Sequence, residues 1–298
     1  MLQHHLILNL IIPNQVKKLI LPESYGMELF YRKFGNEGDQ PLIILHGLFG
    51  LSDNWVTFAR RIAMEGFEVF VPDQRNHGQS PHSGNFNYLA LTDDLFEFID
   101  EHEIEQPVLL GHSMGGKVAM RFTLENAEMV KKLEVVDISM KAYPPRNQHK
   151  QIISAMRQMN LENVKSRRQV EEQLEEFISE QRIRQFVLKN LHRTSQNNFE
   201  WRLNIDGIET NLDDMFDAIE TGQIFEKPTL FIKGGASDYI LLEDFEAIRR
   251  NFPFAEIITI AGASHWVHVE APERFYQLTH GFLTGNPTWY KNLKEKTP

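Results

Sequence analysis

The chain contains no cysteine among its 298 residues. Disulfide bonds, thiolate metal sites and cysteine nucleophiles are therefore excluded. Basic residues are also in the minority, because 31 lysines and arginines stand against 41 aspartates and glutamates, which gives a formal net charge of −10. Nucleic acids and anionic membrane surfaces are bound through clustered lysine and arginine, so we expect neither as a partner.

Long apolar runs are missing as well. The run at residues 6–12 (LILNLII) is far shorter than the ~20 residues needed to span a bilayer. No lysine or arginine precedes it and no small-residue cleavage site follows it, which favours a leading strand or a tail over a signal peptide. We predict a cytoplasmic protein with peripheral termini at residues 1–16 and 286–298.

Metal-ligand clusters, glycine-rich nucleotide loops and internal repeats are likewise not evident in the sequence. We therefore predict no metal and no cofactor. The residue pattern also carries no signal of oligomeric state.

Short apolar runs do alternate with segments of helical periodicity. The apolar runs cover residues 41–45 (PLIIL), 67–71 (FEVFV), 108–110 (VLL), 133–137 (LEVVD), 228–233 (PTLFIK) and 256–260 (EIITI). Helical spacing is found between them, for example at residues 88–102 and 116–124, and a last helix is expected at residues 272–283. This alternation predicts an α/β protein with a mostly parallel sheet and helices on both faces.

The region at residues 143–221 is different in character. It is rich in charge, and its apolar residues, such as Val170, Leu174 and Phe177, recur at helical spacing without a convincing strand. We interpret it as a set of amphipathic helices that cap the carboxyl edge of the sheet. The predicted organisation is a core of residues 17–139 and 222–285, with a helical cap of residues 140–221 inserted into it.

A serine motif follows the predicted strand at residues 108–110. The sequence there contains G-x-S-x-G at Gly111, Ser113 and Gly115, and a predicted helix comes next. In this context the motif marks a sharp, strained turn that presents the serine oxygen at the amino end of a helix. Backbone N–H groups at such a helix end face a developing oxyanion. Ser113 is therefore the candidate nucleophile.

An oxyanion hole requires two donors. We expect one from the N–H of Met114, directly after the nucleophile. The other should come from residues 46–50 (HGLFG), where Leu48 is the first choice and Phe49 the alternative. The glycines of this loop let its backbone approach a substrate carbonyl. We interpret His46 as a buried structural histidine.

Twelve histidines compete for the role of base. His265 lies in residues 262–266 (GASHW), directly after a predicted strand, and such loops carry the chemistry of α/β enzymes. It also completes the order nucleophile, acid, base. We expect His268 to be structural and His112, next to the nucleophile, to point away from it. His265 is the candidate base.

Two aspartates at strand ends are candidates for the acid. Asp238 follows the predicted strand at residues 228–233, which is the usual position in this order, and Asp137 ends the predicted strand at residues 133–137. Either carboxylate would orient the imidazole and stabilise its protonated form. The residues alone leave both possibilities open.

Five segments form a recognisable set. They are HGLFG at residues 46–50, DQRNHGQS at 73–80, GHSMGGK at 111–117, VDI at 136–138 and GASHWVH at 262–268. Together they resemble YbfF-type esterases and the related mitochondrial abhydrolases of the α/β-hydrolase superfamily, over roughly residues 29–283. The resemblance implies the α/β-hydrolase fold and a carboxylesterase or acyl-CoA thioesterase for small to medium acyl groups. It also places the acid at the VDI segment, which favours Asp137 over Asp238. The sequence departs from many of these relatives by having Asp238, because they often lack an acid at that later position.

The predicted reaction is hydrolysis of an ester or thioester through an acyl-enzyme. A carbon–carbon bond hydrolase, an acyltransferase or a hydrolase-derived receptor with slow turnover would keep the same residues. Serine at the elbow argues against dehalogenases and epoxide hydrolases, which use aspartate. The expected partner is a small acyl ester or thioester, in a pocket walled by Phe49, His112 and Trp266. We interpret Asp73, Arg75, Asn76 and His77 as a hydrogen-bonded loop that braces the floor of the site.

Overall fold

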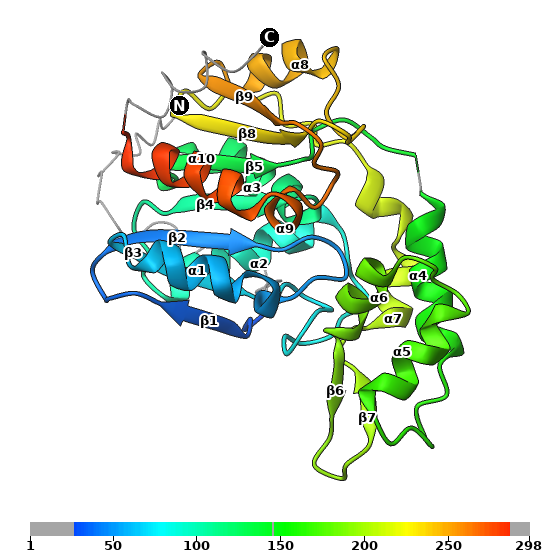
Figure 1. Cartoon of the computed structure of the whole chain (residues 1–298). Helices are drawn as coiled ribbons and strands as arrows, with labels where there is room; N and C mark the ends of the chain where they lie inside the picture. Colours follow the sequence, from blue (N-terminus) through cyan, green and yellow to red (C-terminus); the bar gives the residue numbers. More distant parts are fainter. Residues whose placement is uncertain (1–26, 145, 287–298) are drawn as a thin grey trace, which may run out of the picture.

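The computed structural model describes residues 27–144 and 146–286 (Figure 1). The apolar run at residues 6–12 lies outside these ranges, so its expected conformation is not described. Within them, no helix combines the length and the apolar character that crossing a membrane would take.

Seven strands form one sheet in the order β1-β3-β2-β4-β5-β8-β9. Their bounds are β1 Tyr31–Phe34, β2 Gln40–Leu45, β3 Phe67–Pro72, β4 Val108–His112, β5 Lys132–Val136, β8 Thr229–Gly234 and β9 Ala255–Ile260. Only β1 pairs antiparallel with its neighbour, and the other pairs are parallel. The carboxyl ends of six strands therefore meet at one edge of the sheet.

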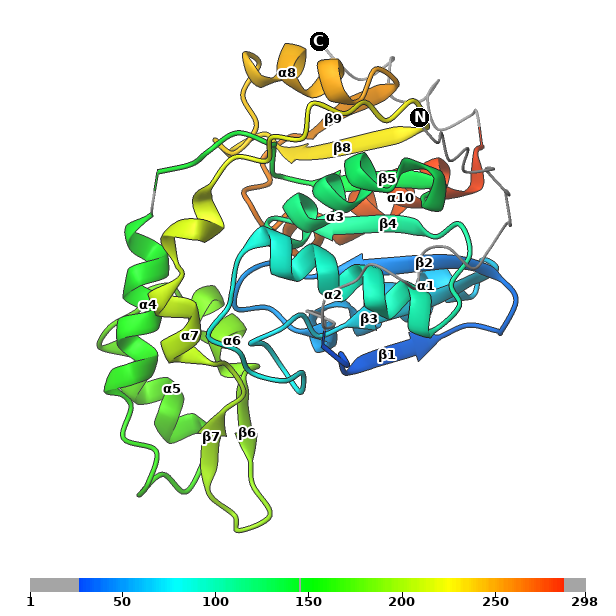
Figure 2. The ribbon, with the colours of Figure 1, turned by 180° about the vertical axis from the view of Figure 1, so that it is seen from behind.

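Helices cover both faces of the sheet (Figures 1 and 2). One face carries α1 Val56–Ala63 and α10 Pro272–Thr284, and the other carries α2 Tyr88–Glu101, α3 Met114–Glu125 and α8 Asp244–Asn251. The short helix α9 Val267–Glu270 precedes α10. This is the arrangement that the alternating pattern predicts.

Strand β2 illustrates how the sequence fixes this arrangement. Leu42 and Ile44 pack in the apolar cluster that contains α1 and α10, whereas Ile43 and Leu45 pack in the cluster that contains α2 and α3. All four are at most 1% exposed. A continuous apolar run is what a parallel strand needs when both of its faces are buried.

The segment between β5 and β8 lies beyond the carboxyl ends of the strands (Figure 1). It contains α4 Asn147–Gln158, α5 Arg167–Glu175, α6 Gln181–Leu188, β6 Leu191–Arg193, β7 Phe199–Trp201, α7 Ile205–Thr210 and the 3-10 turn η4 Asp213–Phe216. We call residues 147–216 the helical insertion. The predicted division between core and cap, at residues 140 and 221, falls in the connections on either side of it and stays a proposal.

The expectation of no strand in this region was wrong, because β6 and β7 pair as an antiparallel hairpin. Each strand has three residues, which is too short to produce a readable alternation of apolar and polar positions. The apolar periodicity of the helices was read correctly. Val170 and Leu174 are fully buried in α5.

Four successive strand ends carry a residue with positive φ that is not glycine. They are Phe49 after β2 (63°), Asn76 after β3 (68°), Ser113 after β4 (53°) and Asp137 after β5 (51°). Such backbone is costly for residues with a side chain, and it persists where the surroundings enforce it. Four of the seven non-glycine residues with positive φ in the described part of the chain therefore lie at the edge of the sheet that faces the helical insertion.

Candidate active site

Ser113 lies on the tight turn between β4 and α3 that the G-x-S-x-G motif predicts. A Cβ added at Gly111 would lie 2.2 Å from the carbonyl oxygen of Gly115, and one added at Gly115 would lie 2.4 Å from that of Leu45. Only glycine allows the strand and helix to approach this closely. The Ser113 N–H donates to the Val136 carbonyl at 3.1 Å, which ties the turn to the end of β5.

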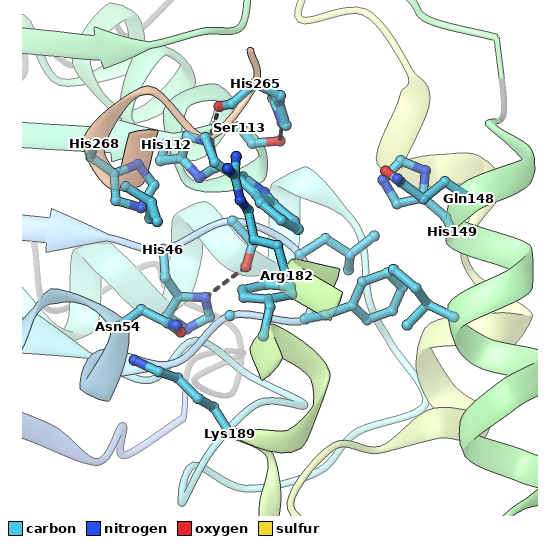
Figure 3. A pocket seen from close by; sticks show the side chains of 18 of the residues that line it. His46, Asn54, His112, Ser113, Gln148, His149, Arg182, Lys189, His265 and His268 are labelled. Atoms are coloured by element: carbon cyan, nitrogen blue, oxygen red, sulfur yellow. Dashed lines mark hydrogen bonds between the residues drawn. The ribbon is translucent and has the colours of Figure 1, made fainter. Parts of the chain in front are cut away.

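Three side chains from separate strand ends form a continuous chain of hydrogen bonds. His265 Nε2 lies 2.9 Å from Ser113 Oγ, and His265 Nδ1 lies 2.8 Å from Asp137 Oδ2. An ionised carboxylate can only accept, so Nδ1 carries the proton and Nε2 is free to accept from the serine hydroxyl. Figure 3 shows Ser113 and His265 together at one end of a cavity.

Asp137 is completely buried, and its carboxylate has protein donors besides His265. Its Oδ1 accepts the Gly234 N–H at 2.8 Å, and its Oδ2 also accepts the Ser237 hydroxyl. These bonds fix the carboxylate in one orientation and compensate the loss of water. A buried carboxylate with fixed hydrogen-bond partners, such as Asp137, can hold the imidazole of His265 in one orientation.

Asp238 lies elsewhere, although it is next to Ser237. Its side chain is 69% exposed and its Oδ1 accepts from Arg146 at 2.7 Å. The hydrogen bond from the Arg146 guanidinium holds the pKa of Asp238 below its usual range. The structure thus brings Asp137 to His265, and it pairs the exposed Asp238 with Arg146.

Further contacts fix the loop that carries His265. The ring of Tyr239 stacks on the imidazole with centroids 3.8 Å apart and an interplanar angle of 16°. On the backbone side, His112 Nε2 lies 3.0 Å from the His265 carbonyl oxygen. Both the N–H and the hydroxyl of Ser264 donate to Glu270 at 2.6 Å. Sequence reasoning missed Tyr239 and Glu270, because neither belongs to a motif and their role comes from folded contacts.

The loop at residues 46–50 offers the amides of Leu48 and Phe49 as candidates for the second oxyanion donor. Phe49 is engaged through both backbone groups, since its N–H donates to His77 Nε2 at 3.1 Å and its carbonyl accepts from Asn190 at 2.8 Å. The Phe49 amide is thus already engaged, and the assignment of the second donor to Leu48 stays a prediction. Met114 begins α3, where the first amides have no acceptor within the helix.

The segment after β3 braces this loop, as expected from the sequence. The Gln74 N–H donates to His46 Nε2 at 2.9 Å, and the Gln74 side chain donates to the His46 carbonyl at 2.6 Å. His77 Nδ1 lies 2.9 Å from the Arg75 carbonyl oxygen. Burial lowers the pKa of His77 to about 3 and lowers that of His46, so both rings are neutral supports.

The remaining polar residues of that segment are also structural. Asp73 Oδ1 accepts the Ser52 N–H at 2.6 Å, and Arg75 forms a two-pronged ion pair with Asp94 at 2.5 and 2.6 Å. The Asn76 side chain accepts from the Ser83 N–H at 2.7 Å. The interpretation of this loop as a brace is therefore confirmed by its contacts.

A cavity of about 290 Å³ opens beside Ser113 (Figure 3). The three pocket residues predicted from the sequence, Phe49, His112 and Trp266, all line it. Trp266 packs against Phe186 of the helical insertion, with ring centroids 5.1 Å apart. Trp266 thereby connects the core to the insertion across the cavity.

The polar part of this cavity wall is cationic and histidine-rich. Arg146, Arg182 and Lys189 line it, and the lining residues that the structure describes contain no carboxylate. Carboxylates outside the lining pair with these cations, namely Asp238 with Arg146, Glu270 with Arg182 and Asp53 with Lys189. Burial lowers the pKa of His149 to about 4 and that of His268 to about 3, so both contribute neutral rings.

Comparison with known proteins identifies the family. Residues 40–272 match the family model described as alpha/beta hydrolase fold. The chain belongs to this family. It is 38% identical to the sn-1-specific diacylglycerol lipase ABHD11 of Danio rerio, over 86% of this chain and 83% of the relative. It is 32% identical to the esterase YbfF of Escherichia coli, over 82% of this chain and 93% of the relative.

A solved structure is similar as well. A marine microorganism esterase superposes with a TM-score of 0.82 and 42% sequence identity, over 86% of this chain and all of that one. The predicted fold class and the resemblance to the YbfF-type and abhydrolase branch are thus confirmed. The region that the family model matches, residues 40–272, spans strands β2 to β9 and the helical insertion alike.

Proposed function

We propose that the protein is a serine hydrolase that cleaves carboxylic esters of small to medium acyl groups through an acyl-enzyme. The observation that carries the proposal is the hydrogen-bonded chain from Ser113 through His265 to the buried Asp137. Relatives named esterase and lipase support ester hydrolysis in general. The proposed substrate partner is a small molecule, and the cytoplasmic location stays a prediction.

Each proposed step uses one of these groups. His265 Nε2 takes the Ser113 proton as the serine oxygen attacks the ester carbonyl, while Asp137 stabilises the imidazolium that forms. The N–H groups of Leu48 and Met114 bind the oxyanion. His265 then returns the proton to the leaving oxygen, and in the second half it activates the water that releases the acid.

A thioester substrate is a second candidate. The cavity wall contains Arg146, Arg182 and Lys189, which pair with Asp238, Glu270 and Asp53. A leaving group with several negative charges, such as the phosphates of coenzyme A, would compete with these carboxylates for the cations. A neutral leaving group would gain nothing from them. An acyltransferase or a carbon–carbon bond hydrolase would use the same three catalytic side chains. Product analysis with an added alcohol as acyl acceptor distinguishes the acyltransferase.

The test compares wild type with Ser113→Ala on p-nitrophenyl acetate and butyrate, and on acetyl-CoA beside the acetyl thioester of N-acetylcysteamine. We expect sustained turnover that falls at least about 10³-fold in the variant, with unchanged thermal unfolding. Activity that survives in Ser113→Ala would refute the nucleophile. One burst followed by a stall would indicate a receptor. Equal kcat/KM for the two thioesters would reject the cationic site.

A further inference from the structure

Ser113 borders two cavities of very different size. The large cavity, described above, measures about 290 Å³. A second, small cavity of about 20 Å³ also borders the serine. The residues that line it but not the large cavity are Met114, Ile138, Met215, Phe216, Tyr88 and Tyr143. Leu48, His149 and Tyr239 border both spaces, as Ser113 does.

The small cavity has apolar walls that are themselves packed. Met215 and Phe216 are 5% and 7% exposed, and Phe216 packs on the ring of His149 with centroids 5.2 Å apart. The Tyr88 hydroxyl donates to the Met215 carbonyl at 2.9 Å, and the Tyr143 hydroxyl donates to the Tyr239 carbonyl at 2.7 Å. With both hydroxyls engaged, the space suits an apolar group.

Its volume limits that group to a few atoms. About 20 Å³ is little more than the space that one water molecule occupies. A longer chain would have to displace Met215 or Phe216, which are buried against the core. Forcing extra methylene groups into packed interior is unfavourable.

The position of His265 decides which part of the substrate goes where. His265 lines the large cavity and is not among the residues of the small one. Its Nε2 has to reach the leaving oxygen or sulfur to return the proton, so the leaving group belongs on the large side. The oxyanion points to the amides of Leu48 and Met114. Leu48 and Met114 both line the small cavity, so the carbonyl oxygen and the acyl substituent lie on that side of Ser113.

We propose that the small cavity is the acyl subsite and that it restricts the enzyme to acetyl and similarly short acyl groups, carried on large leaving groups. This inference rests on the proposed function and narrows it. Met215 and Phe216, which the helical insertion supplies, are then the residues that set acyl length. The large cavity, with its aromatic and cationic wall, accepts the alcohol or thiol.

The experiment keeps p-nitrophenol as the leaving group and lengthens the acyl chain from acetate to octanoate. For wild type we expect kcat/KM to fall on the order of 10- to 100-fold from acetate to hexanoate. Met215→Ala should raise the hexanoate-to-acetate ratio about 10-fold. Phe216→Leu provides a second, milder enlargement in case the first variant does not fold.

Ile152→Ala is the matched control, because Ile152 is also buried, at 3% exposure, but lines only the large cavity. Its hexanoate-to-acetate ratio should stay within about two-fold of wild type. The inference is overturned if wild type cleaves octanoate as well as acetate, or if neither enlarging variant shifts the ratio. Absence of any Ser113-dependent esterase activity would instead refute the proposed function.

Discussion

The two sides of the cavity hold their side chains in different ways. On the sheet side, the carboxylate of Asp137 is completely buried and bonded to Gly234 and His265. On the insertion side, the side chains of Arg182 and Lys189 are 58% and 39% exposed. Buried, bonded groups keep the single geometry that bond making requires, whereas exposed ones adapt to different ligands. The sheet edge therefore suits the chemistry and the insertion suits selection.

The most severe test of this difference compares the two candidate acids. Asp137→Asn should lower kcat about 10³- to 10⁴-fold, because an amide at this position no longer fixes the imidazole tautomer. Asp238→Asn should change kcat by less than about three-fold, because it removes only an exposed ion pair with Arg146. Steady-state kinetics on p-nitrophenyl acetate, with circular dichroism as a folding control, measures both.

Comparable losses in the two variants would contradict the assignment of the acid to Asp137. A large loss confined to Asp238→Asn would reverse it. Either result would also weaken the contrast between a fixed sheet edge and an adaptable insertion, because it would make an exposed carboxylate essential for catalysis.

The same contrast explains what could be read from the sequence. Ser113 and His265 stand in local motifs whose spacing reflects a strand-to-turn geometry, so they could be found without a structure. The choice of acid could not be derived in that way, because Asp137 and Asp238 both lie in segments that follow strands and only the folded distances distinguish them. The resemblance to a known branch supplied the preference for Asp137.

The helical insertion was less predictable from the sequence than the core. Its helices follow apolar periodicity, but the residues that its fold brings to the site do not. His149 looks like any of the twelve histidines in the sequence, and its place between the two cavities results from the way α4 lies over the sheet edge. Met215 and Phe216 likewise gain their role from the end of η4 meeting Ser113.

A test with a smaller expected effect concerns the attachment of the helical insertion to the core. Lys117 in α3 is completely buried, and its Nζ donates to the carbonyl oxygens of Lys141, at 2.9 Å, and Asp217. Those residues lead into and out of the helical insertion. Lys117→Met should lower kcat/KM about 10-fold and weaken the preference for acetate, because Asp217 adjoins Phe216 and the insertion would lose a fixed point.

Lys132 offers a control of the same chemistry. Its Nζ donates to the carbonyl oxygens of Phe282 and Leu283, at 2.8 and 2.9 Å, at the amino-terminal end of β5. Lys132→Met and Lys117→Met should each lower stability in urea denaturation by about 1–3 kcal/mol, because buried carbonyls lose a donor. Only Lys117→Met should change the acyl-length profile. Matching kinetics in the two variants would show that Lys117 has no influence on the insertion.

The smallest effect on activity is expected at Glu134, which lies within β5 and is completely buried. Burial raises its pKa to about 8, while its Oε1 accepts the Thr279 hydroxyl at 2.5 Å. Because the folded-state pKa is above the ordinary value of 4.5, the folded protein binds this proton more tightly than the unfolded chain does. The associated stability is complete below about pH 4.5 and is lost as the pH rises towards about 8.

Glu134→Gln keeps the neutral form at every pH, so it removes this dependence. Between about pH 4.5 and 8, the stability of the variant relative to wild type should rise by up to about 1.4 kcal/mol per pH unit, while kcat on p-nitrophenyl acetate stays unchanged. Denaturant unfolding at several pH values measures the slope. A constant difference would mean that Glu134 already ionises at its ordinary pKa. A change in kcat would mean that the ionisation of Glu134 affects Ser113, His265 and Asp137 through the interior of the sheet. It would then limit the contrast between a fixed sheet edge and an adaptable insertion.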